Sequence, residues 1–313
     1  MDLCLVCPSD RSVLSLSDDS DGAAYVCRDC GDRFAVADGV VRFLDRPDEF
    51  YEGRFLHTIQ YEPSSESWHM AWPLWLVNSG YVWSVRKYVP AGRTVVEVGC
   101  ASGVAYFAHR YKLIGLDLSH SSLRQVADLY AACLQADATQ AFPLPDQSVD
   151  AVISSFFWEH IPPELKPRVL AQCHRVLAPG GKLVFLYDID SRNPLYRYLI
   201  RRDPELFRRI LIEKEGHLGW QTAGANRAVF ESNGFRVIDN QGCEKTPMIG
   251  PAMYDKVQHW GGWLGRAARV GHRFSRAPWF QAYNGATRVV DATVGALLPL
   301  DWSRVVISVC EKQ

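Results

Sequence analysis

Three features that would place a protein in a membrane, outside the cell or on nucleic acid are missing from this sequence. No apolar run comes near the roughly 20 residues that a bilayer-spanning helix needs. The first residues, Met1 to Cys4, contain no basic region followed by an apolar segment, so no secretion signal is predicted. Acidic residues (35) balance basic ones (34), and the formal net charge of −1 gives no support for nucleic-acid binding. We therefore expect a cytoplasmic globular protein.

The chain is long enough for more than one folded unit. Its 313 residues, 48% of them hydrophobic, can bury a large core and still supply a small additional domain. We expect a small unit over 1–45, an aromatic-rich helical linker or lid over 46–90, and a large domain over 91–313.

One stretch has the composition of a buried strand that runs into a tight turn. It reads Val95-Val96-Glu97-Val98-Gly99-Cys100-Ala101-Ser102-Gly103. Glycines stand where the backbone must bend sharply or lie against a ligand. The dinucleotide pattern G-x-G-x-x-G is absent, because Ala101 and Val104 occupy its second and third glycine positions.

Strand and helix patterns alternate after this turn. The predicted strands are 93–98, 112–117, 132–136, 149–155 and 181–188, and the predicted helices begin at 103 or cover 120–131 and 164–177. Such alternation is typical of a parallel sheet with helices on both faces, which binds ligands outside the carboxyl ends of its strands.

The motifs at these strand ends carry a family resemblance. The pattern Glu97-x-Gly99-x-Ala101-x-Gly103 is followed by the segments 113–119, 135–138, 142–150, 151–161 and 175–184. Together they resemble the motifs of class I S-adenosylmethionine-dependent methyltransferases of the type 11 group, over about 90–243. The resemblance implies an α/β, doubly wound Rossmann-like sheet of seven strands with an antiparallel last strand. Strands six and seven would then be 235–243 and 303–310, with an insertion over about 244–302.

The resemblance also implies a site for the cofactor S-adenosyl-L-methionine. Asp117 would accept hydrogen bonds from the ribose hydroxyls, Asp137 would accept from the adenine amino group, and Glu97 would orient the amino end. The residues expected at the cofactor are Glu97, Gly99, Cys100, Ala101, Gly103, Asp117, Leu118, Asp137, Ala138, Ser154 and Ser155. A plainer alternative makes the glycines simple turn residues, Asp117 a solvated strand end and Asp137 a helix cap.

Four cysteines form two C-x-x-C pairs near the start of the chain. Cys4 and Cys7 are separated from Cys27 and Cys30 by nineteen residues, a spacing that favours a structural four-thiolate zinc site in a ribbon. Two disulfides are the alternative, which a reducing cytoplasm disfavours. A zinc ribbon ahead of such a domain resembles the bacterial 23S rRNA guanine-N1 methyltransferases and also occurs in other type 11 members.

His160 is the candidate catalytic base, because it follows the fourth predicted strand directly and its ordinary pKa suits proton transfer at neutral pH. It could equally cap a helix or satisfy a loop. His217 and Tyr187 are weaker candidates for the same role. The aromatic residues of 46–90 either line an acceptor pocket or pack the ribbon onto the sheet.

The insertion carries an uneven charge. From Lys256 to Val290 the sequence has basic residues and no acid. Arg266, Arg269, Arg273 and Arg276 recur at helical spacing, while Trp260, Leu264, Ala267 and Phe274 fall on another face. Peripheral membrane contact through 256–290, an anionic substrate, or a solvated helix that covers the sheet edge would each explain this pattern.

Three functions follow from these observations. The first is methyl transfer to a small-molecule, sugar or lipid-linked acceptor by in-line displacement. The second is methylation of a guanine base in ribosomal RNA, which the neutral charge makes less favoured. The third is a non-catalytic binding protein that keeps the fold.

Overall fold

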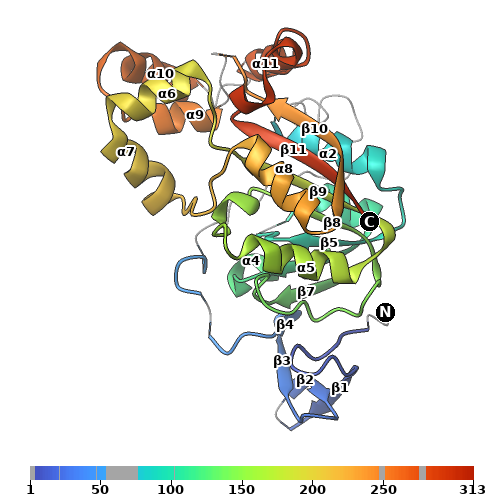
Figure 1. Ribbon diagram of the computed structural model, residues 1–313. Coiled ribbons are helices and arrows are strands. Elements are labelled where there is room, and N and C mark those ends of the chain that lie inside the picture. Colours follow the sequence, from blue (N-terminus) through green and yellow to red (C-terminus); the bar gives the residue numbers. More distant parts are fainter. Residues whose placement is uncertain are drawn as a thin grey trace.

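The computed structural model describes residues 4–20, 22–46, 48–53, 77–101, 103–246, 251–274 and 280–313. Its centre is a mixed β-sheet of eleven strands in the order β1-β2-β3-β4-β7-β6-β5-β8-β9-β11-β10. The N-terminal strands lie at one end of the molecule and a group of helices at the other (Figure 1).

Seven strands form the main part of the sheet: β5 (Thr94–Val98), β6 (Lys112–Asp117), β7 (Ala132–Gln135), β8 (Val149–Ser155), β9 (Leu177–Asp188), β10 (Phe235–Cys243) and β11 (Val305–Lys312). Strands β7, β6, β5, β8 and β9 pair in parallel, and β11 lies antiparallel between β9 and β10. The predicted doubly wound α/β sheet with an antiparallel last strand is confirmed.

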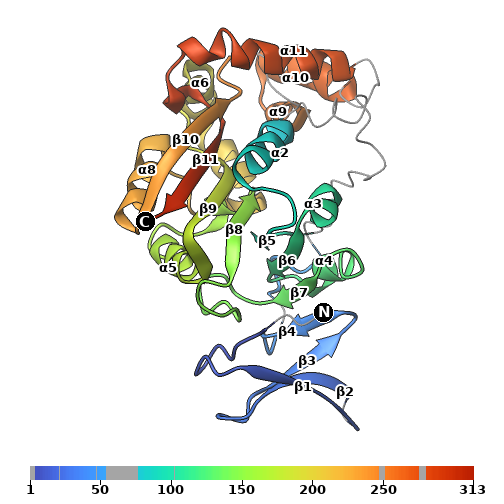
Figure 2. The same cartoon turned by 90° about the vertical axis from the view of Figure 1, so that its right-hand side faces the viewer.

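Helices cover both faces of the parallel strands (Figure 2). The helices on one face are α2 (Val77–Tyr88), α3 (Ala105–Arg110) and α4 (His120–Arg124), and those on the other are α5 (Lys166–Val176) and α8 (Ala223–Ser232). Each face has its own hydrophobic cluster, the first around Tyr81 and Phe107 and the second around Trp158 and Phe230. Because both faces are buried, a ligand reaches the parallel strands only at their ends.

Two elements differ from the expected boundaries. Helix α4 ends at Arg124, because the next residues form successive turns with three-residue hydrogen bonds such as Val126 N–H to Leu123 O. Strand β9 begins at Leu177, before the predicted glycine turn. Its register against β8 jumps from Leu177 to Lys182, so the Pro179-Gly180-Gly181 segment forms an irregularity inside the strand.

The N-terminal unit extends the main sheet. Its strands are β1 (Leu14–Asp19), β2 (Gly22–Cys27), β3 (Arg33–Ala37) and β4 (Val40–Arg42). The sequence predicts that the last hairpin completes a small separate unit, but β4 pairs in parallel with β7, Val40 opposite Cys133. Val40 and Val41 are both buried, and they cover an edge of the parallel sheet that would otherwise offer unpaired backbone groups.

The other end of the sheet carries a helical cap, which we define as 194–214, 251–274 and 280–302. It contains α6 (Pro194–Arg202), α7 (Pro204–Arg208), the π-helix η3 (Arg209–Lys214), α9 (Pro251–Val257), α10 (Gly262–Phe274), α11 (Phe280–Ala292), and the 3₁₀ turns η4 (Gly295–Leu297) and η5 (Leu300–Trp302). Pro204 begins α7, and Asp203 separates that helix from α6. A third hydrophobic cluster, around Tyr196, Met253 and Trp260, joins the two halves of the cap. None of the described helices is both long and apolar enough to span a membrane.

The inward face of α10 differs from the predicted one. Gly265 and Ala268 are buried, whereas Ala267 and Phe274 are exposed and Trp260 precedes the helix. The helix turns its smallest residues inward, because a Cβ on Gly265 would lie 1.7 Å from the Trp260 carbonyl oxygen. Several predicted residues fall outside the described part of the chain, namely Ser102, Arg276, Trp279 and the aromatic residues of 54–76.

The joining of β4 to the main sheet gives a stability prediction. Val40→Ala should lower the free energy of unfolding by about 2 kcal/mol, since it removes buried methyl groups and leaves a cavity between the two units. Chemical denaturation measures the change, and Val13→Ala, at a side chain that is 61% exposed, is the matched control. Equal stability of the two variants would contradict the packing described for β4.

Candidate active site

A single cavity of about 690 Å³ lies at the carboxyl ends of the parallel strands. Five strands contribute a residue at or just after their last position: Gly99, Asp117, Asp137, Ser155 and Asp188. These residues are distant in the sequence and meet because parallel strands end at the same edge of the sheet.

The turn after β5 is held close to its neighbours. Gly99, Ala101 and Gly103 all have positive φ angles, of 61°, 45° and 70°. A Cβ added to Gly99 would lie 2.4 Å from the Phe157 ring, and one on Gly103 would lie 2.2 Å from the Tyr130 hydroxyl oxygen. Only glycine fits at these two positions. Gly99, Cys100, Ala101 and Gly103 all line the cavity, as the cofactor prediction requires.

Asp117 is oriented by two backbone groups. Its Oδ2 accepts a hydrogen bond from the Ala101 N–H at 2.8 Å, and its Oδ1 accepts one from the Ser119 N–H at 2.8 Å. Burial raises the pKa of Asp117, although these backbone donors act in the opposite direction. A carboxylate oxygen can accept more than one hydrogen bond, so both oxygens can still accept from a ligand. Leu118 lines the cavity beside it.

Asp137 and Ala138 also line the cavity, in a local turn after β7. The Asp137 Oδ1 accepts from the Thr139 N–H and hydroxyl, each at 2.8 Å, and Oδ2 accepts from the Gln140 side chain at 3.0 Å. This carboxylate therefore caps its own turn, as the plainer alternative expects, at a position that also faces the cavity.

Glu97 and Ser154 are not among the cavity-lining residues. Glu97 is buried and accepts a hydrogen bond from the Tyr130 hydroxyl at 2.5 Å, while the Val104 N–H donates to the same hydroxyl oxygen at 2.9 Å. Burial raises the pKa of Glu97 to about 8. The Ser154 hydroxyl donates to the Val98 carbonyl at 2.7 Å. The Glu97 and Ser154 side chains therefore support the β5 turn on the side away from the cavity, whereas Ser155 lines the cavity.

The described part of the linker contributes one side of the cavity. The Glu52 carboxylate accepts from the His120 and Ser121 N–H groups at 3.0 and 2.9 Å and so anchors this segment on the start of α4. The neighbouring Tyr51 lines the cavity, with its ring centroid 6.0 Å from that of His160.

The second half of the cavity contains His160 and His217. His160 lies in the 3₁₀ turn η2 (Trp158–His160) after β8, and its Nδ1 donates to the Gly216 carbonyl at 3.2 Å. Burial lowers the pKa of His160 to about 4, even though the Gly216 carbonyl acts in the opposite direction. Burial also lowers the pKa of His217 to about 3. Both rings are therefore uncharged at neutral pH. Tyr187, the other weaker candidate, does not line the cavity, because its hydroxyl lies in the core at 2.7 Å from the Ser308 hydroxyl.

A buried acidic pair lies beside the histidines. The Asp188 N–H donates to the Glu159 Oε1 at 3.3 Å. Burial and the nearby Asp188 charge raise the pKa of Glu159 to about 8. Burial alone would also raise the pKa of Asp188, but the Arg304 guanidinium, 2.6 Å away, and the nearby Lys256, His217 and His160 together outweigh it and lower that pKa.

Several residues of this half carry no clear sequence signal. Asp188 could have been found from its place at the end of a parallel strand, and Glu159 from its place next to His160. Lys256 and Arg304 come from the cap and from the start of β11, more than 65 residues beyond Asp188, and no motif marks them.

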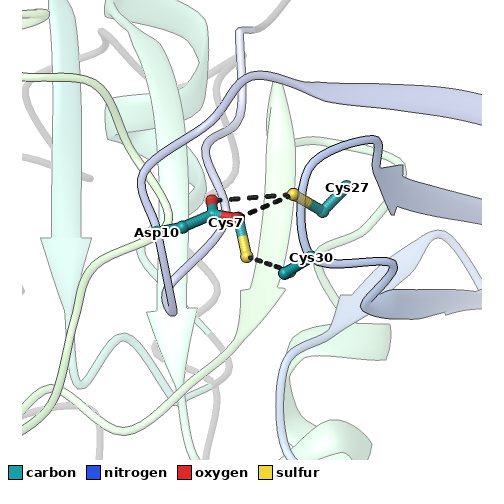
Figure 3. A group of neighbouring side chains, drawn as sticks. All are labelled: Cys7, Asp10, Cys27 and Cys30. Atoms are coloured by element: carbon teal, nitrogen blue, oxygen red, sulfur yellow. Dashed lines mark hydrogen bonds between the residues drawn. The ribbon is translucent and has the colours of Figure 1, made fainter.

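The N-terminal cysteines form a second candidate site (Figure 3). The side chains of Cys7, Asp10, Cys27 and Cys30 offer donor atoms that all lie within 4.8 Å of one another. The Cys7 and Cys30 sulfurs are 3.6 Å apart, and the Cys27 sulfur is 3.3 Å from the Asp10 Oδ2. Zn–S bonds of about 2.3 Å in a tetrahedron separate the sulfurs by about 3.8 Å, so these donors fit a zinc ion.

Cys4 does not belong to this group, contrary to the expected set of four thiolates. It is exposed, and Asp10 is the fourth member of the group. The residues directly after Cys4 are already hydrogen-bonded to the rest of the protein. The Val6 N–H donates to the Pro143 carbonyl, and the Leu14 N–H donates to the Leu5 carbonyl. The turn from Cys7 to Arg11 then brings the Asp10 carboxylate towards the sulfurs.

Residues 96–185 match the model of the type 11 family, described as "Methyltransferase domain". The chain carries a class I S-adenosylmethionine-dependent methyltransferase domain.

The methyltransferase domain has curated relatives. A protein of Mycolicibacterium smegmatis named as a probable S-adenosylmethionine-dependent methyltransferase is 35% identical over 124 residues, which are 38% of this chain and 46% of that protein. Malonyl-acyl-carrier-protein O-methyltransferase 1 of Coxiella burnetii is 35% identical over 98 residues, 29% of this chain and 32% of that protein. The chain thus spans less than half the length of these relatives.

Solved structures match the chain over a wider range at lower identity. A mycolic acid cyclopropane synthase in complex with S-adenosylhomocysteine is 16% identical, with a TM-score of 0.49, over 75% of this chain and 84% of that one.

The role expected for Asp117 gives a prediction for cofactor affinity. Asp117→Ala should weaken S-adenosylmethionine binding about 10- to 100-fold, since a hydrogen bond to a charged group contributes about 1.5–3 kcal/mol. Isothermal titration calorimetry measures the affinity, with Asp128→Ala, at an exposed carboxylate, as the control. If the two variants bound the cofactor equally well, Asp117 would not contact it.

Proposed function

We propose that this protein transfers the methyl group of S-adenosylmethionine to a small acceptor held in the second half of the cavity. The observation that carries the proposal is the continuity of one cavity of about 690 Å³ from Gly99 and Asp117 to His160 and His217. That volume lies within the range of about 300–1,000 Å³ in which proteins bind small molecules.

Methyl transfer from a sulfonium is an in-line displacement, and the protein must mainly align the acceptor with the methyl group. In this proposal Asp117 holds the ribose, Asp137 receives the adenine amino group, and the β5 turn lies against the methionine part. His160 faces the acceptor. With a pKa of about 4 it is a weak base at neutral pH, so positioning the acceptor suits it better than proton abstraction.

A lipid-linked acceptor is supported by the outer face of α10. Trp263, Val270 and Phe274 follow one another at helical spacing and are 67%, 57% and 44% exposed. Exposed arginines at 266, 269 and 273 flank this stripe. An aromatic and apolar stripe beside arginines is typical of helices that lie in a membrane interface. We propose that α10 makes a peripheral membrane contact.

The alternative functions require sites of different shape and charge. A ribosomal RNA guanine methyltransferase needs an open basic groove, whereas the wall beyond the cofactor half is buried and contains Glu159 and Asp188 as well as Lys256 and Arg304. This arrangement favours a small acceptor. A non-catalytic protein of the same fold would bind the cofactor without transferring its methyl group.

The function is tested by incubating the protein with methyl-labelled S-adenosylmethionine and three separate extracts: aqueous metabolites, lipids and RNA. The proposal expects label in the metabolite or lipid extract and none in RNA. If the acceptor is in the lipid extract, Trp263→Ser should lower its labelling about tenfold, since an interfacial side chain contributes roughly 1.5 kcal/mol. Trp83→Ser, also exposed but on α2, is the matched control. Label found in RNA alone, or cofactor binding without transfer to any extract, would refute the proposal.

We infer that the N-terminal cluster binds one structural zinc ion through Cys7, Asp10, Cys27 and Cys30. The unit has a small core, and a bound metal would supply folding free energy that the core lacks. Four protein donors leave no open position, so the ion would take no part in methyl transfer.

The ligand set gives a prediction that separates the structure from the sequence pattern. Cys27→Ser and Asp10→Ala should each lower zinc affinity at least about 100-fold, whereas Cys4→Ser should leave it unchanged. Competition with a chromophoric chelator measures the affinity of each full-length variant. Loss of zinc from Cys4→Ser and its retention by Asp10→Ala would instead support the four-thiolate set.

A further inference from the structure

Three side chains with metal-binding donor atoms converge in the second half of the cavity. Glu159, His160 and His217 each place one donor atom within 4.8 Å of the other two. The two imidazole rings are nearly perpendicular, at 89°, with their centroids 5.2 Å apart. They come from two distant segments, the turn after β8 and the loop after η3.

Two atoms of this group are buried and have no hydrogen-bond partner among the residues that the structure describes. They are the Glu159 Oε2 and the His217 Nδ1, in residues that are only 1% and 4% exposed. The His217 Nδ1 lies 4.0 Å from the Asp188 carboxylate. Leaving such atoms unsatisfied is costly, and a cation between them would satisfy both.

The contacts behind the three side chains resemble those that orient metal ligands. The Gly216 carbonyl can only accept a hydrogen bond, so the His160 Nδ1–H donates to it and this contact fixes the orientation of the ring. The Glu159 Oε1 is held by the Asp188 N–H. Ligating histidines and carboxylates in metalloproteins are commonly fixed by such contacts.

A buried lysine fixes the loop that carries His217. The Lys166 Nζ donates to the Gly219 carbonyl at 2.7 Å and to the Gln221 and Asn226 side chains at 2.9 Å. The Gly219 N–H in turn donates to the Glu159 carbonyl at 2.8 Å. The loop and the turn of Glu159 and His160 are therefore tied together, which holds the donor atoms in one place.

The charged side chains around the three donor groups balance one another. Lys256 and Arg304 bring two positive charges, and Asp188 and Glu244 bring two negative ones, with Arg304 bonded to both acids. Glu215 and Asp255 also line this cavity, and the Glu159 carboxyl, next to the two imidazoles, would bind a cation in its deprotonated form.

We propose that Glu159, His160 and His217 bind a divalent transition-metal ion that coordinates an oxygen atom of the acceptor. Two imidazoles and one carboxylate suit such ions, and three protein ligands on a cavity wall leave positions open for a substrate. This inference rests on the proposed function for its substrate class: small molecules that present a hydroxyl or carbonyl oxygen to the metal. The ion holds the acceptor beside the cofactor half of the cavity.

The test is a titration of the zinc-loaded, full-length protein with Co²⁺, followed by optical absorption. We expect one equivalent of Co²⁺ with the weak bands of nitrogen and oxygen ligands. Cobalt in the N-terminal cluster would instead give intense thiolate bands. Glu159→Gln and His217→Ala should each weaken Co²⁺ binding at least about 100-fold. His109→Ala, at an exposed histidine of α3, should bind like the unchanged protein.

Cofactor binding is measured on the same samples by calorimetry, so that the two proposals can fail separately. Normal S-adenosylmethionine binding with no Co²⁺ bound, or Co²⁺ affinity equal in His217→Ala and His109→Ala, would overturn the metal site and leave the proposed function standing. Co²⁺ binding that depends on Glu159 and His217, in a protein that does not bind the cofactor, would support the metal site and overturn the proposed function.

Discussion

The close approach of the β5 turn to its neighbours is the constraint on which the site depends. Gly99 lies against the Phe157 ring and Gly103 against the Tyr130 hydroxyl, with no space for a Cβ at either position. The same hydroxyl donates to Glu97 and accepts from the Val104 N–H. The turn is therefore fixed from behind by buried groups, and its backbone faces the cavity at a defined place beside Asp117.

The two halves of the cavity have different physical characters because different parts of the fold build them. The half around Gly99 and Asp117 is made by strand ends and by short turns that bond to their own backbone. The half around His160 and His217 is made by side chains from the turn after β8, the loop after η3, α9 and the start of β11. Burial shifts the pKa values of Glu159, His160 and His217 in the directions that favour their neutral forms.

The sequence predicts the strand-end half of the cavity well and the half around His160 and His217 poorly. The alternation of strands and helices places Gly99, Asp117 and Asp137 at one edge, since parallel strands end together. By contrast, Lys256 and Arg304 reach the cavity only through the packing of the cap and the antiparallel β11. The N-terminal cluster shows the same limit, because cysteine spacing predicts four thiolates and cannot show that the chain after Cys4 is bonded to the sheet while Asp10 faces the sulfurs.

A structure of the protein in complex with S-adenosylhomocysteine tests the central claim most directly. The account predicts ribose hydroxyls within hydrogen-bond distance of the Asp117 carboxylate and a sulfur atom that faces Glu159 and His160. A ligand bound with its ribose away from Asp117, or with its sulfur turned away from Glu159 and His160, would contradict it.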